Sequence, residues 1–168
     1  MKAIQTQYKG YNFRSRLEAR WAVYFDSLGI KWEYEAEGYK FENGTCYLPD
    51  FWLTDIKMFV EVKPVELTDE EKNKCEMLAR ESDKPVLMLI GTPSRKSYDA
   101  VYYYDDEYGL IENNFALSNY HNYPYDENRF YAAFDGDEIY ENWFDDIDTH
   151  VISARSARFE HGQQGATL

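Results

Sequence analysis

Residues 45–64 read TCYLPDFWLTDIKMFVEVKP, and the fold prediction starts from their pattern. Apolar and polar residues alternate along it, as they do in half-buried β-strands, and Thr54-Asp55 marks a turn in its middle. A similar alternation precedes it, separated by the turn residues Asn43-Gly44. We therefore predict a meander of three consecutive antiparallel strands, near 31–42, 45–53 and 57–63.

Helices flank the predicted meander. Residues 15–29, SRLEARWAVYFDSLG, repeat apolar residues at helical spacing between a potential cap at Ser15 and a terminating Gly29. Thr68, with Glu71 three residues later, predicts a capping box that opens a helix at 69–82. The apolar run VLMLIG after Pro85 predicts a strand buried on both faces. The order helix, three-strand meander, helix, strand indicates an α/β (α+β) fold, with a mixed central sheet flanked by helices.

The remaining residues give a weaker pattern, within what we expect to be a single domain over 1–168. The predicted parts are a core at 11–91, an acidic tyrosine-rich β extension at 98–152, and a short helix and tail at 153–168. Within the later parts the expected elements are a hairpin at 100–117, a loop at 118–127, a second hairpin from 128–134 and 138–143, and a short helix near 151–161.

Charge is distributed unevenly. The net charge is −13, yet residues 1–64 carry nine basic and nine acidic residues, whereas 65–152 carry seven and twenty-one. A neutral N-terminal portion can face an anion while the acidic remainder faces solvent or another partner. No segment approaches the ~20 apolar residues of a membrane span, and Cys46 and Cys75 lack the spacing of a disulfide or zinc site. We expect a cytoplasmic protein without a membrane partner.

Three charged residues stand out in the apolar strands. Side chains alternate along a strand, so Glu61 and Lys63 share one face, and antiparallel pairing brings Asp50 onto that face. A carboxylate pair beside a backbone carbonyl suits a hard cation such as Mg²⁺. A metal there can activate water and neutralise a phosphate, while a nearby lysine stabilises developing negative charge.

The pattern of charged residues resembles that of the PD-(D/E)XK nuclease superfamily. It consists of a helix that carries Glu18, then Pro49-Asp50, and, after ten further residues, Glu61-Val62-Lys63. The resemblance covers residues ~11–91 and implies a restriction-endonuclease-like core, as found in small phage and bacterial nuclease-like proteins. It implies Mg²⁺- or Mn²⁺-dependent hydrolysis of phosphodiester bonds by an endo- or exonuclease. The metal ligands would be Asp50, Glu61 and the Val62 backbone carbonyl, with Lys63 beside the attacking water and Glu18 as an accessory acid.

Each site residue also has a structural interpretation. Glu18 lies three residues after Ser15, and its role can be limited to a capping box at the start of the helix. Asp50 can pair with Lys57, and Glu61 with Lys63, as ordinary ion pairs. Three charges on one face between bulky apolar neighbours fit that interpretation poorly, because an unpaired buried charge is costly.

The partner that we expect is nucleic acid, with DNA favoured, in phage or bacterial DNA metabolism. Basic residues at the start of the first helix can hold phosphates next to the metal, although a solvated helix face is an equal alternative; they are Lys9, Arg14, Arg16 and Arg20. The alternative function is a binding protein that retains a nuclease fold and engages a basic host or replication protein through its acidic face. A homodimer is a further partner arrangement that the sequence allows.

Overall fold

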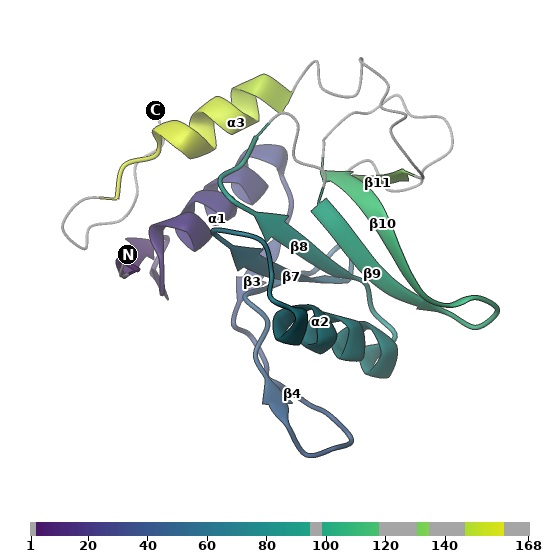
Figure 1. Ribbon diagram of the computed structural model, residues 1–168. Helices are drawn as coiled ribbons and strands as arrows, with labels where there is room; N and C mark the ends of the chain where they lie inside the picture. Colours follow the sequence, from purple (N-terminus) through teal and green to yellow (C-terminus); the bar gives the residue numbers. More distant parts are fainter. Residues whose placement is uncertain (1–2, 95–98, 118–130, 135–146, 160–168) are drawn as a thin grey trace.

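The structure is a computed structural model that describes residues 3–94, 99–117, 131–134 and 147–159. Within these ranges the chain forms a mixed α+β fold, in which helices cover both faces of one large sheet (Figure 1). The helices are α1(Arg16–Leu28), α2(Asp69–Ser82) and α3(Ile147–Ser156). The sheet order is β11(Tyr131–Phe134), β10(Gly109–Leu117), β9(Asp99–Asp105), β8(Val86–Ile90), β7(Met58–Lys63), β6(Phe51–Leu53) and β3(Trp32–Tyr34).

Two small hairpins lie outside the large sheet: β1(Thr6–Tyr8) with β2(Tyr11–Phe13), and β4(Tyr39–Lys40) with β5(Cys46–Tyr47). In the large sheet β7 and β8 run parallel, and the other described neighbours run antiparallel. The parallel pair requires a crossover, which α2 provides. The mixed sheet predicted from the sequence is therefore confirmed.

The first predicted helix is confirmed as α1, one residue shorter at each end. Ser15 accepts a hydrogen bond from the backbone N–H of Glu18, and Gly29 ends the helix with a φ of 80°, a conformation that costs glycine little. Its apolar side packs on one sheet face in a core that includes Trp21, Phe25 and Val60. Helix α3 completes the same layer, with Val151 and Ala154 buried in that core.

Helix α2 covers the opposite face. Its capping box forms as predicted: Thr68 accepts from the Glu71 backbone N–H, and Glu71 accepts from the Thr68 backbone N–H. Leu78 and Ala79 pack with Val86 of β8 and Tyr102 of β9. Strand β8 is buried on both faces, as its apolar sequence predicts.

The long strands predicted at 31–42 and 45–53 are wrong in detail. Each breaks in two, so β3 and β6 stay in the large sheet while β4 and β5 form their own hairpin. Glu35 has a φ of 45°, and this left-handed conformation cannot continue a strand. Pro49 lacks the backbone N–H that a ladder requires, and it lies between β5 and β6.

The C-terminal expectations have mixed outcomes. The hairpin at 100–117 is confirmed as β9 and β10, which extend the large sheet beyond β8. Strand β11 pairs with β10, and the short helix begins at 147 and ends at 156 rather than spanning 151–161. The loop at 118–127, the strand at 138–143 and the tail at 160–168 lie outside the described residues. In the described part, no helix is long and apolar enough to cross a membrane.

Candidate active site

The end of β7 and the start of β6 bring the predicted site residues together. Phe51 and Val60 form the last pair of the β6–β7 ladder at this end. Asp50 comes directly before Phe51 and therefore lies just beyond the end of that ladder. Its Oδ2 accepts a hydrogen bond of 2.8 Å from the backbone N–H of Val62. Asp50 and Glu61 are 8% and 7% exposed. The negative charge of Glu61 acts on Asp50, and the carboxyl oxygens that gather with that of Asp50 within 4.8 Å belong to Glu18 and Glu35. A shared metal site of Asp50 and Glu61 stays a prediction.

The two faces of β7 divide as predicted. Val60 and Val62 lie in the core under α1, which leaves Glu61 and Lys63 for the opposite face. The Val62 backbone contacts the site through its N–H, which Asp50 accepts. A role for the Val62 carbonyl oxygen as a metal ligand stays a prediction.

Glu18 belongs to both of its proposed environments. Its Oε1 accepts from the Ser15 hydroxyl at 3.0 Å, and its backbone N–H donates to Ser15 at 3.2 Å. Its Oε2 accepts from the Tyr34 hydroxyl. One oxygen each from Glu18, Glu35 and Asp50 lie within 4.8 Å of one another. Ser15 therefore caps α1, and the Glu18 carboxylate accepts from the Ser15 hydroxyl rather than from the Ser15 backbone N–H that a capping box uses. Glu18 also stands beside Asp50.

Glu35 is a site residue that the sequence analysis missed. Its backbone N–H donates to the Asp50 carbonyl oxygen at 2.9 Å, and its side chain forms an ion pair with Arg14. The left-handed conformation of Glu35 turns the chain at this point. A strand pattern gives no signal for such a turn at a glutamate, and thus none for its place next to Asp50.

Proximity and burial shift the acid equilibria of the two carboxyl groups. Burial, followed by the negative charges of Glu61 and Glu18, raises the pKa of Asp50 to about 8. Burial likewise raises the pKa of Glu61, although hydrogen bonding to Tyr47 and the charge of Lys63 oppose the rise. Carboxyl groups that share a dry site resist ionising together, and a cation between them would relieve that repulsion.

Lys63 bridges the site to α2. Its Nζ lies 3.2 Å from Glu61 Oε1 and 2.9 Å from Glu71 Oε2. Burial lowers the pKa of Lys63, but hydrogen bonds and charge attraction from these two glutamates outweigh it and raise the pKa overall. Hydrogen bonding from Thr68 and Lys63 lowers the pKa of Glu71 to about 2. Lys63 is therefore held as a cation, and the predicted Glu61–Lys63 ion pair is present.

Two tyrosines complete the surroundings of the acidic residues. Tyr47 of β5 donates a hydrogen bond of 2.5 Å to Glu61 Oε2 and lies 3.9 Å from the sulfur of Cys75. Tyr34 of β3 holds Glu18 in the same way. The sequence offers sixteen tyrosines, and only the breaks between β3 and β4 and between β5 and β6 select these two.

The predicted basic patch is divided among different partners. Of its four residues, Arg14 lies against the acidic group through Glu35. Lys9 pairs with Asp26 at 2.9 Å. Arg20 donates through Nη1 to the carbonyl oxygens of Ala154, Arg155 and Ala157. Arg16 is exposed. Phosphate contacts by any of the four residues stay a prediction.

The donor chemistry fits a hard divalent cation. Carboxylate oxygens are the ligands that Mg²⁺ and Mn²⁺ prefer, and among the described residues those of Glu18, Glu35 and Asp50 form the group suited to a metal ion. Glu61 is not a member of this group; its two oxygens contact Tyr47 and Lys63, and a role for Glu61 as a metal ligand stays a prediction. Within the described residues, the histidine and cysteine side chains lie outside the one acidic group suited to a metal ion.

A scan against protein-family models finds no match, and a search of the curated proteins finds none that reaches significance.

Proposed function

We propose that this protein is a metal-dependent nuclease of the PD-(D/E)XK superfamily, with a restriction-endonuclease-like core, that hydrolyses phosphodiester bonds of DNA in the cytoplasm. One observation carries the proposal. Asp50 and Glu61 are almost fully buried, the charge of Glu61 acts on Asp50, and Lys63 forms an ion pair with Glu61. Ionised carboxyl groups are expensive to bury without a positive partner, and carboxyl groups whose pKa is raised in this way cluster at functional sites.

Each residue then has a defined task. Asp50 and Glu61 would hold the cation, with Glu18 as a further acidic neighbour. Bound Mg²⁺ would supply activation of water and neutralisation of phosphate charge. Lys63 would stabilise the negative charge that develops at the scissile phosphate, because its ammonium group stays protonated. Arg14 and Arg16 would contact phosphates beyond the scissile bond.

Cleavage of single- and double-stranded DNA in the presence of Mg²⁺ or Mn²⁺ tests the proposal. We expect wild-type protein to cleave, and Asp50→Asn and Lys63→Ala to lose activity by about 10²-fold or more. Asp55→Asn and Lys31→Ala are matched controls, because these side chains are 46% and 75% exposed, and both should cleave like wild type.

The opposite results are equally distinct. Metal-independent cleavage, or full activity in a folded Asp50→Asn protein, would reject the assigned site. A protein that binds a basic partner, binds no divalent cation and cleaves neither DNA nor RNA would support the alternative, a binding protein with a nuclease fold.

A further inference from the structure

A pocket opens on the face of the sheet opposite α1, at the β3 edge. Glu33, Trp52 and Phe59 stand in one row across β3, β6 and β7, because Glu33 pairs with Trp52 and Trp52 pairs with Phe59. Phe59 in turn pairs with Val86, where the core under α2 begins. The row therefore runs from Phe59, beside the core that α2 covers, to the exposed carboxylate of Glu33.

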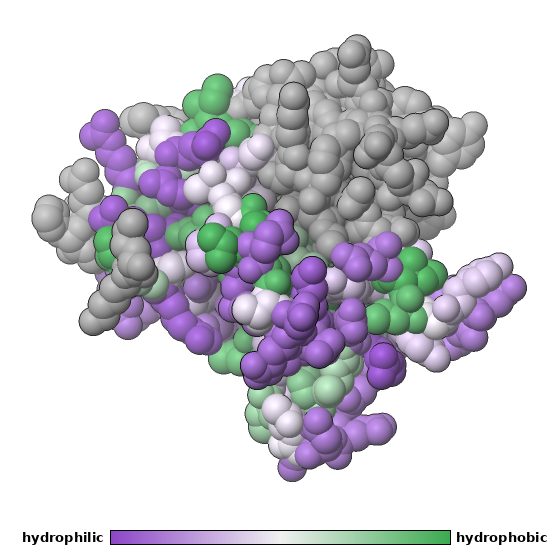
Figure 2. Space-filling model, in the orientation of Figure 1, coloured by the Kyte–Doolittle hydropathy of each residue, from purple (hydrophilic) through white to green (hydrophobic). Residues whose placement is uncertain are grey.

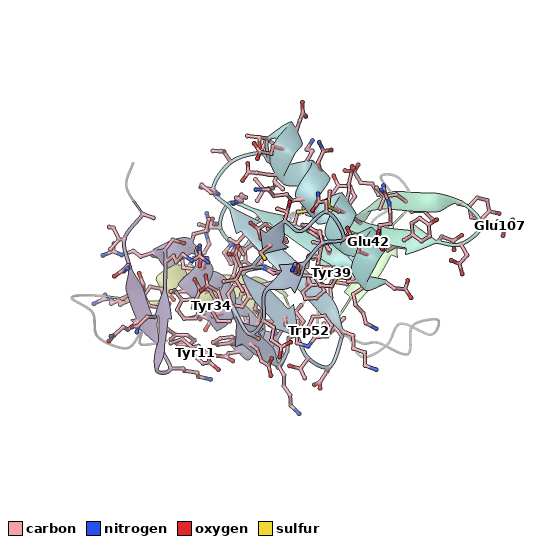
Figure 3. The ribbon with its side chains drawn as sticks, turned by 90° about the horizontal axis from the view of Figure 1, so that it is seen from below. Tyr11, Tyr34, Tyr39, Glu42, Trp52 and Glu107 are labelled. Atoms are coloured by element: carbon pink, nitrogen blue, oxygen red, sulfur yellow. The ribbon has the colours of Figure 1, made fainter. Side chains whose placement is uncertain are left out.

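Residues from the connection between β3 and β4 form the wall of this pocket. Glu37 and Tyr39 line it together with Pro49, and its volume is about 490 Å³. Figure 3 shows Tyr39 and Trp52 on the same part of the molecule, with Glu107 far away at the tip of the β9–β10 hairpin. A volume of this size is within the ~300–1,000 Å³ of typical ligand sites.

The lining combines aromatic rings with negative charge. Trp52 and Phe59 are half-buried and their ring centroids lie 4.7 Å apart. Glu33 and Glu37 are exposed at the same pocket. Among the described residues that line it, none is a lysine or arginine. Aromatic faces attract cations, and two carboxylates without a basic neighbour in the lining strengthen that preference.

We propose that this pocket binds an arginine side chain presented by a basic protein partner. A guanidinium group stacks flat on aromatic rings while its N–H groups donate to carboxylates. The volume accommodates the arginine together with part of its neighbouring residues. A nucleobase would also stack on Trp52, but its phosphates would approach Glu33 and Glu37 and be repelled. The net charge of −13 attracts a basic partner from a distance.

The hydropathy of the surface suits a basic, polar partner. Among the coloured residues of Figure 2, hydrophilic ones predominate and hydrophobic ones are scattered. A partner would thus recognise a concave aromatic feature that carries carboxylates at its edge. Pro49 and Phe51, which line this pocket, flank Asp50 in the chain, but none of the carboxylates of the proposed metal site lines it. Arginine binding here therefore does not require nuclease activity.

NMR titration tests the pocket directly, with the indole N–H of Trp52 as the reporter. The probes are the capped peptide Gly-Gly-Arg-Gly-Gly and its citrulline analogue, which keeps the planar shape but lacks the charge. We expect the arginine peptide to shift the Trp52 signal and to bind about fivefold or more tightly than the citrulline peptide. Glu33→Gln/Glu37→Gln should weaken arginine binding by a similar factor.

A matched pair of substitutions separates the pocket from general charge attraction. Asp106→Asn/Glu107→Gln removes the same two charges from exposed positions in the β9–β10 turn, and it should leave arginine binding unchanged. Equal weakening by both double variants, equal binding of citrulline, or no shift of Trp52 would overturn the proposal. A single-stranded oligonucleotide that shifts Trp52 more than the arginine peptide would assign the pocket to a base instead.

Discussion

Cys75 and Cys46 show how the environment of a residue sets its reactivity. Cys75 is fully buried and Cys46 is exposed. Burial, together with the negative charge of Glu61, raises the pKa of the Cys75 thiol to about 12. The reactive thiolate form is therefore almost absent from Cys75 near neutral pH.

Thiol titration at pH 8 should accordingly find one fast-reacting group in the native protein and two after denaturation. Cys46→Ser should abolish the fast reaction, whereas Cys75→Ser should leave it intact. Two thiols reacting at equal rates in native protein would contradict the burial of Cys75 beside Tyr47.

Tyr47 is the residue whose removal distinguishes tuning of the site from simple packing. Its hydrogen bond lowers the pKa of Glu61, so Tyr47→Phe should raise that pKa further. Glu61 would then ionise only at higher pH, and the midpoint of pH-dependent Mn²⁺ binding should move upward. Tyr34→Phe, which removes the hydrogen bond to Glu18, should move the midpoint less. A variant of Tyr47 that loses stability but keeps the wild-type midpoint would assign the tyrosine to packing alone.

At the scale of elements, Arg20 joins α1 to the end of α3. Its guanidinium donates to three carbonyl oxygens there, at 2.7 to 3.3 Å. These are the groups that a helix C-terminus leaves without partners. Its neighbour Arg16 is exposed, which makes the two arginines a matched pair on one helix.

We expect Arg20→Gln to lower the free energy of unfolding by about 1–3 kcal/mol, because the carbonyl groups lose a charged donor. Arg16→Gln should change it by less than ~0.5 kcal/mol, while weakening DNA binding and flattening its salt dependence. Urea unfolding and a salt series of binding measurements check both. Equal stability of the two variants would contradict the capping role of Arg20.

The elements also show what could be predicted from the sequence and what could not. Helices α1 and α2 were predictable because their caps, Ser15 and Thr68, act within four residues. The faces of β7 were predictable too, with Val60 and Val62 in the core, because strand alternation is local. Glu35 and Tyr47 were not, because their places depend on where β3 and β5 leave the sheet. The contacts of Arg20 join residues more than 130 positions apart, beyond the reach of any local pattern.

At the scale of the whole molecule, the buried acids couple stability to pH. The pKa of Asp50 is about 8 in the folded protein, above the ~4 of an unfolded aspartate. The folded state then binds more protons than the unfolded state between these values, so its stability decreases as pH rises through this window. Without metal, the melting temperature should fall between pH 5 and pH 8, and Asp50→Asn should reduce that fall. A wild-type melting temperature that rises across this range would contradict the sign of the shift.

Divalent cations should reverse this loss, since they bind the ionised carboxylates of the folded state. Mg²⁺ or Mn²⁺ should therefore raise the melting temperature more at pH 8 than at pH 5, where protons occupy the site. An equal increase at both values would point to binding elsewhere on the acidic surface.

The most direct test is calorimetric titration of Mn²⁺ at pH 7 in buffers of different ionisation enthalpy, which counts the protons released on binding. A cation that binds at Asp50 and Glu61 must displace a proton from this pair, so wild type should release up to about one proton per ion. Asp50→Asn should lose both the high-affinity binding and the proton release, while Asp55→Asn should behave like wild type. Equal affinity for Mn²⁺ in Asp50→Asn and wild type, without proton release in either, would contradict the assignment of this site.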